Sequence, residues 1–425
     1  MPERVARFSL LLLPPALLHS NALAEVLIGV IIGALSTNRA LHHDWSWLRS
    51  PWVMLAGLWW VWLLLCSLPP LAAPETWPAM SIQAFLSLRF LLLAVALENL
   101  LAENARTRRL LFLVVGVCAV YFVGQLALQM TTGKNLFGNA VLDNGVLTGP
   151  FDRSRAGPEL VRMLFPVLLP PAAWLLSRPA MASRIAGGAL LALGIAIMVP
   201  IGQRMPLLLA GFGLAVSALL LPRLRRPAML AGLVALATLA AATALFPAAQ
   251  HRLVFLFAEQ MENFPTSHYG LILARTLAMA AAHPWTGRGF GAFRTGASDP
   301  RYFAPSLDGT LADGGGAGIY VTHPHNFYLQ ALVDSGVFGL ALFAVLAAVW
   351  LGMLARGLRR APDPLRVGLF IAALLHLWPL ATTDDFFSQR IGGWFFLLLG
   401  WGLAEARAAR RATATPKLGQ GPTLA

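Results

Sequence analysis

Residues 325–355 read HNFYLQALVDSGVFGLALFAVLAAVWLGMLA, and Asp334 is the only aspartate, glutamate, lysine or arginine among them. A helical block of about 20 apolar residues matches the hydrocarbon thickness of a bilayer. Similar blocks recur along the chain, which is 57% hydrophobic and only 12% charged. A soluble domain normally carries about twice that share of charge. The pattern therefore excludes an ordinary globular core and indicates a protein that crosses a membrane many times.

These apolar blocks predict an all-α polytopic membrane protein with about twelve transmembrane helices. Their expected ranges are 5–18, 22–36, 51–69, 78–98, 109–130, 155–177, 184–199, 203–221, 228–246, 325–355, 365–380 and 391–409. The first two are short enough to form a tilted hairpin. The resulting organisation is transmembrane helices 1–9 over 1–246, an outer loop over 247–324, helices 10–12 over 325–411 and a polar tail over 412–425.

The basic residues orient these helices. With the N-terminus in the cytoplasm, 20 of the 32 basic residues fall in cytoplasmic segments, whereas the outer loop 69–77 has none. Of the 32 basic residues 30 are arginine, and membrane orientation explains them better than nucleic-acid binding does. Both termini are then expected inside the cell. The start of the chain, up to Ala22-Leu23-Ala24, also resembles a cleavable signal peptide, but a retained first helix is preferred.

The two cysteines, Cys66 and Cys118, both lie inside apolar runs. This position predicts packing roles rather than a disulfide framework. No cysteine and histidine cluster has the spacing of a structural zinc site.

Residues 247–324 form a long loop that is expected on the outer face. Its arginines and acidic residues balance in number, with five of each. A helix is predicted near 268–282, ended by Pro284, and a glycine-rich segment and the run Asp313–Gly316 follow. Loops of this length are usually functional or disordered. These features predict that part of the loop folds over the membrane face.

Polar candidates gather at the outer ends of two predicted helices. Pro324 suits a first helical turn, which would place His325 in that turn. A helix N-terminus disfavours a cationic imidazole, so His325 is expected to be a neutral proton acceptor, unless it merely caps or anchors the helix. Gln203-Arg204 opens the eighth predicted helix, where an arginine needs an anionic partner unless it reaches out to the membrane surface. Helix N-termini with arginine side chains suit phosphate groups.

Three further positions are candidates for the same outer site. The glycines of the segment 283–294 would let its backbone approach a ligand closely, and Arg288 is a second candidate for phosphate binding or else a solvated arginine. Arg155 and Arg162 open the sixth predicted helix, where they either reach this site or pair within the helix or with lipid headgroups. The neighbouring carboxylates at 384 and 385 either orient a base or an arginine, or form a solvated turn.

The outer motifs together resemble the O-antigen ligase and polymerase superfamily. The motifs are His325-Asn326 with Leu329, Leu332, Gly336 and Gly339; His283-Pro284 with Gly287, Gly289, Gly291 and Phe293; and Gln203-Arg204. Their order and spacing carry the resemblance, which covers most of the chain. Asp334 departs from the pattern, because the family often has glutamate there.

The resemblance implies a GT-C-like glycosyltransferase of the bacterial inner membrane, with its active site facing the periplasm and a glycan on undecaprenyl diphosphate as donor. His325 is similar to the catalytic histidine of the family, and Arg204 and Arg288 to its diphosphate-binding arginines. The candidate substrate-binding residues are Arg204, Arg288, Arg155, Arg162, Asn326, His323 and Asp385. A diphosphate leaving group needs charge stabilisation and the acceptor hydroxyl needs a general base, so an inverting transfer without metal or cofactor is expected.

One dominant outer loop, with a much shorter earlier loop over 131–154, favours an O-antigen ligase, which transfers the glycan to the lipid A-core. The expected partners are this donor, this acceptor and membrane lipids, without nucleic acid. An O-antigen polymerase and a protein O-oligosaccharyltransferase are alternatives from the same superfamily. A twelve-helix transporter or flippase is an alternative of another class, but it would show related halves and a site near the bilayer midplane, and the sequence shows neither.

Overall fold

The computed structural model describes residues 2–72, 74, 77–303, 321–381 and 384–414. Within these ranges the chain is almost entirely helical, and its β-structure is limited to an isolated bridge between Lys134 and Ala140. Seven helical segments of this described part are long and apolar enough to cross a membrane, and three shorter helices are apolar too. The chain is thus an all-α polytopic membrane protein, as predicted, while the number of about twelve spans stays a prediction.

The helices that precede the outer loop fall close to the predicted ranges. They are α1 (Pro2–His19), α2 (Asn21–Leu41), α3 (Pro51–Cys66), α4 (Ala79–Leu86), α5 (Leu88–Ala102), α6 (Ala105–Thr132), α7 (Ala156–Leu176), α8 (Met181–Ala196), α9 (Met198–Ile201), α10 (Arg204–Leu220) and α11 (Arg225–Leu245). Two predicted ranges are each divided between consecutive helices, α4 with α5 and α8 with α9. Short 3₁₀ turns, Ser46–Arg49 and Pro222–Leu224, precede α3 and α11.

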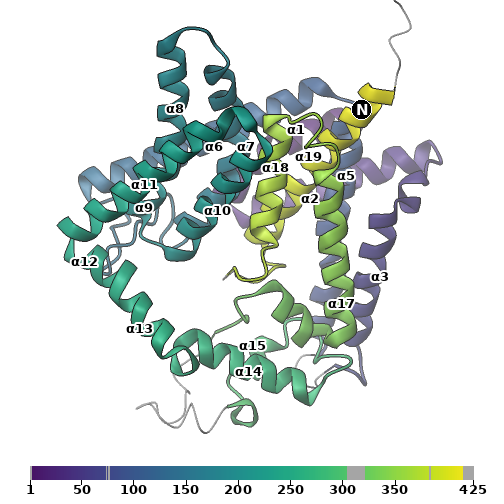
Figure 1. Cartoon of the computed structure of the whole chain (residues 1–425). Helices are drawn as coiled ribbons and strands as arrows, with labels where there is room; N and C mark the ends of the chain where they lie inside the picture. The colour runs from purple at the N-terminus through teal and green to yellow at the C-terminus, as the bar shows by residue number, and fades with distance from the viewer. Residues whose placement is uncertain (1, 73, 75–76, 304–320, 382–383, 415–425) are drawn as a thin grey trace, which may run out of the picture.

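The predicted outer loop, called the outer loop below, contributes α12 (Pro247–Gln250), α13 (Leu256–Glu262), α14 (His268–Ala282) and α15 (Phe293–Gly296), with a π-helical turn over His251–Phe255 and 3₁₀ turns over Phe264–Thr266 and Pro300–Tyr302. The helix predicted at 268–282 is confirmed as α14. In Figure 1 these elements form a layer at one end of the molecule that leads from α11 to α17. The predicted run Asp313–Gly316 lies outside the described residues.

The chain then enters α17 (Phe327–Ala355), α18 (Pro364–His376) and α19 (Gln389–Ala414). The last helix runs past 411, where the polar tail was predicted to begin. It packs against α5 and α18, and every apolar side chain from Ile391 to Ala404 is buried. Figure 1 shows α19 in the centre of the bundle, behind α18. The helix therefore forms the middle of the hydrophobic core.

Close packing at small residues joins the helices of this core. A Cβ atom on Gly400 of α19 would lie 2.9 Å from the carbonyl oxygen of Ala94 in α5, and one on Gly368 of α18 would lie 2.6 Å from that of Phe165 in α7. Lipid tails are as apolar as leucine, so helix association in a membrane depends on fit more than on burial. These glycines allow the backbones to approach.

Polar pairs add links between the helices. The Arg89 guanidinium on α5 donates to both carboxylate oxygens of Glu25 on α2, at 3.0 and 2.9 Å. The Trp52 indole on α3 donates to Glu98 on α5, also at 3.0 Å. Cys66 and Cys118 are free and buried, which agrees with the packing roles predicted from sequence.

Gly368→Ala is expected to destabilise the bundle, because the added methyl group meets the Phe165 carbonyl of α7. Overpacking of this kind costs about 1–3 kcal/mol. Gly211→Ala in α10 is the matched control, since a Cβ there meets no atom within 4 Å. Thermal unfolding of both purified variants in the same detergent measures the difference. Equal melting temperatures for the two variants would show that the α7–α18 contact tolerates a wider spacing.

Candidate functional site

The site is built around a break in α17. Ser335 and Gly336 leave the helical conformation, and Gly336 has φ 68° and ψ −169°. The break frees backbone groups that the segment 284–289 and α3 then pair. Val333 O accepts from Arg288 N (2.8 Å), Asp334 O from Gly289 N (3.1 Å) and Ser335 O from Trp62 Nε1 (2.9 Å), while Val337 N donates to Pro284 O (2.8 Å). The glycine-rich segment is therefore locked onto the helix that follows it.

The glycines of this segment are required by the closeness of the two backbones. Gly287 has φ 65°, and a Cβ there would lie 2.4 Å from the Val333 carbonyl oxygen. A Cβ on Gly336 would lie 2.2 Å from the Trp285 carbonyl oxygen. The sequence predicted a close approach to a ligand, but the observed approach is to α17. Its effect is to fix the backbone on either side of Arg288.

Two histidines stand in series before α17. His323 Nε2 lies 3.1 Å from His325 Nδ1, and the two rings meet edge to face with centroids 4.3 Å apart. His323 Nδ1 lies 3.4 Å from a carboxylate oxygen of Asp384 and 3.1 Å from the Thr322 hydroxyl. The Tyr269 ring of α14 packs against His325 at 5.6 Å. This order of groups orients the His325 ring and links it to a carboxylate.

The helix start differs from the prediction that placed His325 in the first turn. Asn326 is the N-cap of α17, and its side chain accepts hydrogen bonds from Tyr328 N and Leu329 N. Asparagine is among the strongest N-cap residues, so the helix begins at Phe327. His325 lies just before the cap with φ 55°, a conformation that turns the chain away from the helix axis. It still lies near the positive end of the helix dipole.

Asn326 and Asp385 hold the last outer loop against α17. The Asn326 amide donates to the Pro379 carbonyl at 2.6 Å. Asp385 accepts from the Gln330 side chain at 2.7 Å and from Phe387 N at 3.0 Å, and Gln330 in turn accepts from Phe386 N. These contacts position Asp384 beside His323. They give Asn326 and Asp385 a structural part in the site.

A small pocket opens beside His323. It is lined by His323, Pro324, Asp334, Asp385, Gln330, Thr322, the loop residues Phe290, Gly291, Phe293 and Arg294, and Met80 and Gln83 of α4. Arg294, the last residue of the segment 283–294, is an exposed cation at this pocket for which the sequence predicted no role.

Arg288 is buried inside the outer layer, with 1% of its surface exposed. Its guanidinium carbon lies 4.8 Å from the centre of the Tyr302 ring. Hydrogen bonds from Arg301 and the nearby charge of Arg288 lower the pKa of Asp299, with burial opposing them. Arg288 is thus a fixed positive charge beside an acidic side chain of the same layer, rather than the solvated arginine of the alternative interpretation.

Arg204 is the first residue of α10, as predicted. Its guanidinium donates to Gln260 of α13 at 2.8 Å and lies 5.6 Å from the Phe257 ring, and its buried Nη1 has no hydrogen-bond partner in the described part of the chain. Burial and the charge of Arg204 lower the pKa of the neighbouring Arg252. Two guanidinium groups this close favour an anion between or beside them.

The preceding residue, Gln203, ties the start of α10 to the start of α7. Its side chain accepts from Gly157 N at 2.7 Å and donates to the Ser154 carbonyl at 2.8 Å. Arg155 is the N-cap of α7, so this link brings the backbone on either side of Arg155 to the start of α10. Arg162, one of the predicted binding residues, instead pairs with Glu159 of its own helix at 2.9 Å, both of them buried.

Arg390 is a further cation of the site, for which the sequence predicted no role. It opens α19, its guanidinium lies 4.7 Å from the Phe151 ring, and Arg155, Arg162 and Glu159 are its charged neighbours. Two of its nitrogen atoms are buried without a hydrogen-bond partner among the described residues. Arg390 follows an irregular polar loop, where no hydrophobic periodicity in the sequence indicates which way a side chain points.

The predicted residues thus fall into groups. Four of them meet at the start of α17, namely His323, His325, Asn326 and Asp385. Arg288 is buried in the layer formed by the outer loop. Arg204 meets α13 at the start of α10, and Gln203 beside it binds the residues on either side of Arg155. Arg162 is held inside α7. Within the described residues, Arg204 contacts Gln260 and Phe257, whereas Arg288 contacts Tyr302.

These features define a polytopic membrane protein whose histidines and arginines gather where outer elements meet the ends of its helices. The family model described as O-antigen ligase matches residues 189–344, from within α8 to beyond the break in α17. This match confirms the resemblance to the O-antigen ligase and polymerase superfamily, whose members are glycosyltransferase-like enzymes acting on lipid-linked glycans. No curated protein matches the chain.

Gly287→Ala is expected to loosen the outer layer, because the methyl group meets the backbone of α17 at Val333. Gly138→Ala is the matched control, since Gly138 also has a positive φ, 82°, but a Cβ there meets no atom within 4 Å. Limited proteolysis of the purified variants measures the effect, with faster cleavage between α13 and α17 expected only for Gly287→Ala. Equal cleavage of both variants would assign the effect to backbone strain alone.

Proposed function

We propose that the protein is an O-antigen ligase, which transfers a glycan from undecaprenyl diphosphate to a sugar hydroxyl of the lipid A-core at the periplasmic face of the inner membrane. The observation that carries this proposal is the series Asp384, His323 and His325 at the start of α17. Both histidines lie within the segment that matches the O-antigen ligase model.

The series supports a general-base role for His325. If Nδ1 of His325 donates to Nε2 of His323, then Nδ1 of His323 donates to Asp384 and the Nε2 atom of His325 remains the proton acceptor. When His325 takes a proton from the acceptor hydroxyl, the charge that forms is stabilised through His323 by the carboxylate. His323 and Asp384 are positioning residues in this proposal.

The arginines supply the complementary chemistry. A polyprenyl diphosphate is an acidic leaving group, so guanidinium groups that are already in place stabilise the charge that develops on it. Arg204 and Arg288 are proposed for this role, with Arg155 beside the first. Attack from the side opposite the diphosphate inverts the anomeric centre, and we propose that the reaction needs no metal.

One segment, from α13 to α14, runs past all three candidate side chains. Arg204 contacts Gln260 and Phe257 of α13, and Tyr269 of α14 packs against His325. Met279 of α14 belongs to the cluster around Tyr302, the ring beneath Arg288. The three candidate side chains therefore all border this continuous piece of chain.

His325→Ala is expected to lower glycan transfer by about 10²–10⁴-fold, the usual contribution of a general base, while donor binding persists. Arg204→Ala and Arg288→Ala are expected to weaken donor binding or turnover. Arg153→Ala is the control, since this arginine is exposed and its ion pair is with its neighbour Asp152. Transfer from a lipid-linked donor to purified rough lipopolysaccharide measures the effect. Unchanged transfer by His325→Ala would contradict the proposed base.

Asp384→Asn is expected to reduce kcat more than KM and to move the pH–rate profile to lower pH. The amide keeps the shape but removes the negative charge that stabilises protonated His325 through His323. A purely structural role for Asp384 would lower activity without moving the profile.

Ligase and polymerase differ in their acceptor. Lipopolysaccharide from a strain that lacks the gene separates the two on a gel. Rough lipopolysaccharide with carrier-linked polymer still accumulating supports the ligase. Core that carries a single repeat unit supports the polymerase instead, and smooth lipopolysaccharide with normal polymer would contradict both.

A further inference from the structure

A pocket open to the surface lies at the opposite end of the bundle from α14. It lies where the start of α1 and the ends of α2 and α5 meet. The proposed glycan transfer makes no use of it. Under the predicted topology this end faces the cytoplasmic leaflet.

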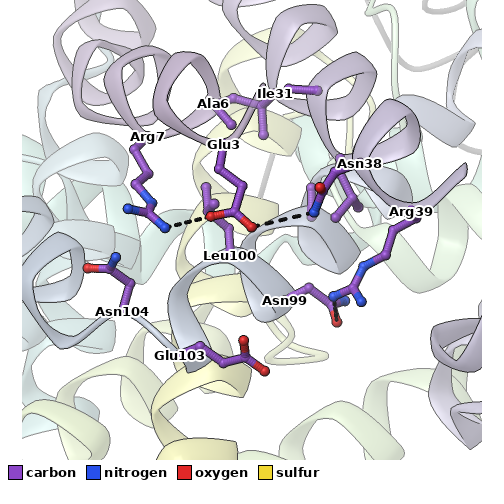
Figure 2. A pocket seen from close by; sticks show the side chains of 13 residues that line it. Glu3, Ala6, Arg7, Ile31, Asn38, Arg39, Asn99, Leu100, Glu103 and Asn104 are labelled. Atoms are coloured by element: carbon purple, nitrogen blue, oxygen red, sulfur yellow. Dashed lines mark hydrogen bonds and ion pairs between the residues drawn. The ribbon is translucent and has the colours of Figure 1, made fainter. Parts of the chain in front are cut away.

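Charges of both signs line this pocket. Glu3 and Arg7 come from α1, Arg39 from α2, and Glu103 follows α5. Figure 2 shows the two carboxylates and the two guanidinium groups alternating around the opening. The four side chains sum to zero charge, so the pocket matches a ligand that carries one charge of each sign.

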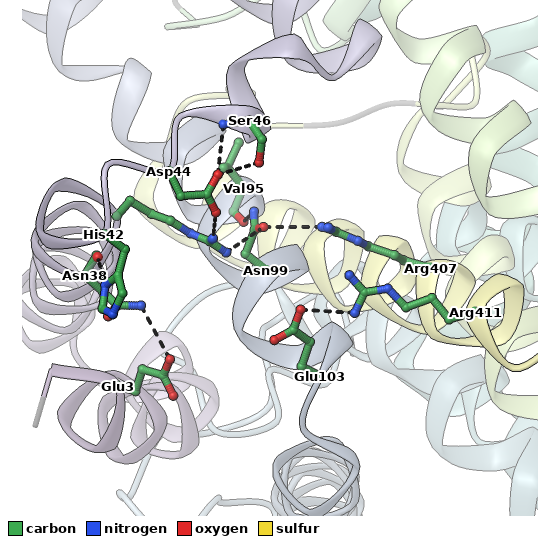
Figure 3. Close-up of polar contacts among 11 residues, drawn as sticks. Glu3, Asn38, His42, Asp44, Ser46, Val95, Asn99, Glu103, Arg407 and Arg411 are labelled. Atoms are coloured by element: carbon green, nitrogen blue, oxygen red, sulfur yellow. Dashed lines mark hydrogen bonds and ion pairs between the residues drawn. The ribbon is translucent and has the colours of Figure 1, made fainter. Parts of the chain in front are cut away.

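Several of these groups are held by polar neighbours, and Figure 3 shows those of Glu3 and Glu103. Arg39 pairs with Asp44 and donates to Asn99 at 3.1 Å. Glu103 accepts from Arg411 of α19 at 3.1 Å. A carboxylate accepts about four hydrogen bonds and a guanidinium donates five, so capacity remains for a ligand.

Glu3 is fixed in the same way by its own hairpin. It accepts from Arg7 at 2.7 Å and from Asn38 of α2 at 3.4 Å. The Nε atoms of both lining arginines are buried without a hydrogen-bond partner in the described part of the chain. The charged groups are thus oriented before any ligand arrives.

Three asparagines, Asn38, Asn99 and Asn104, complete the polar part of the lining, and the deeper wall is apolar. Ile31, Ala34 and Leu35 of α2 and Ala96 and Leu100 of α5 continue from the charged rim toward the middle of the bundle. A polar rim above an apolar wall fits an amphipathic molecule whose head stays at the membrane surface.

We infer that this pocket binds the headgroup of a phospholipid that carries a phosphate and a primary ammonium group. Arg7 and Arg39 contact the phosphate, and Glu3 and Glu103 accept hydrogen bonds from the ammonium. The first carbons of the acyl chains follow Leu35 and Leu100. A purely anionic headgroup would meet two carboxylates, and a quaternary ammonium has no N–H to donate.

The test uses the purified full chain in detergent, titrated separately with phosphatidylethanolamine, phosphatidylcholine and phosphatidylglycerol. Phosphatidylethanolamine is expected to raise the melting temperature by about 5 °C more than the other two, because it binds only the folded state. Native mass spectrometry is expected to show about one retained molecule per chain, the number that one pocket holds. Equal shifts with all three lipids, or a larger shift with phosphatidylglycerol, would overturn the inference.

Two variants locate the effect. The double variant Arg7→Gln, Glu103→Gln removes one group of each sign and is expected to abolish the preference. Ala34→Phe fills the pocket from its apolar wall, so it is expected to lose the lipid without losing a charge. Arg109→Gln, an exposed arginine outside the pocket, is the control and is expected to keep the preference. A preference that survives both pocket variants would place the lipid elsewhere.

Discussion

Where α17 breaks, its backbone N–H and C=O groups need hydrogen-bond partners. The contacts that supply these partners organise the outer half of the molecule. An unpaired peptide group away from water costs several kcal/mol. The break at Ser335 and Gly336 exposes such groups, and the segment that follows α14 pairs them together with Trp62 of α3. Because that segment precedes α17 in the chain, the outer layer and the transmembrane bundle are joined by main-chain hydrogen bonds.

This junction also explains why the charged side chains keep fixed positions. Arg288 lies between Gly287, whose N–H donates to the His283 carbonyl, and Gly289, whose N–H donates to the Asp334 carbonyl of α17. His325 precedes the capped start of the same helix and rests on Tyr269. Both therefore depend on one rigid unit rather than on the conformations of a free loop. Preorganisation of this kind is what stabilisation of developing charge requires.

Much of this architecture could be predicted from the sequence, because helices in a membrane need long apolar blocks and basic residues mark their ends. α14 could be placed from its helical pattern and the proline after it. The break in α17 was not predicted, since the polar pair Asp334 and Ser335 before Gly336 is short and the apolar run resumes directly after it. Likewise, Pro324 suggested an early helix start, but the stronger capping of Asn326 moved it to Phe327.

The candidate site was predictable only in part, for a physical reason. His325, Arg204 and Arg288 stand at motif positions, so their chemistry could be inferred along the chain. The pairing of His323 with Asp384 joins residues from two separate outer segments, and Arg390 reaches α7 from a third. Such encounters depend on how helices pack, which a single sequence does not encode in any local pattern.

The break in α17 also marks a boundary. Val337–Ala355 spans about 28 Å at about 1.5 Å per residue, which is close to the thickness of the hydrocarbon layer by itself. Under the predicted topology, the turns from Phe327 to Asp334 then lie toward the headgroups. This long apolar helix then consists of a membrane-spanning part and a short interfacial part, and Asp334 is buried among protein groups rather than facing lipid.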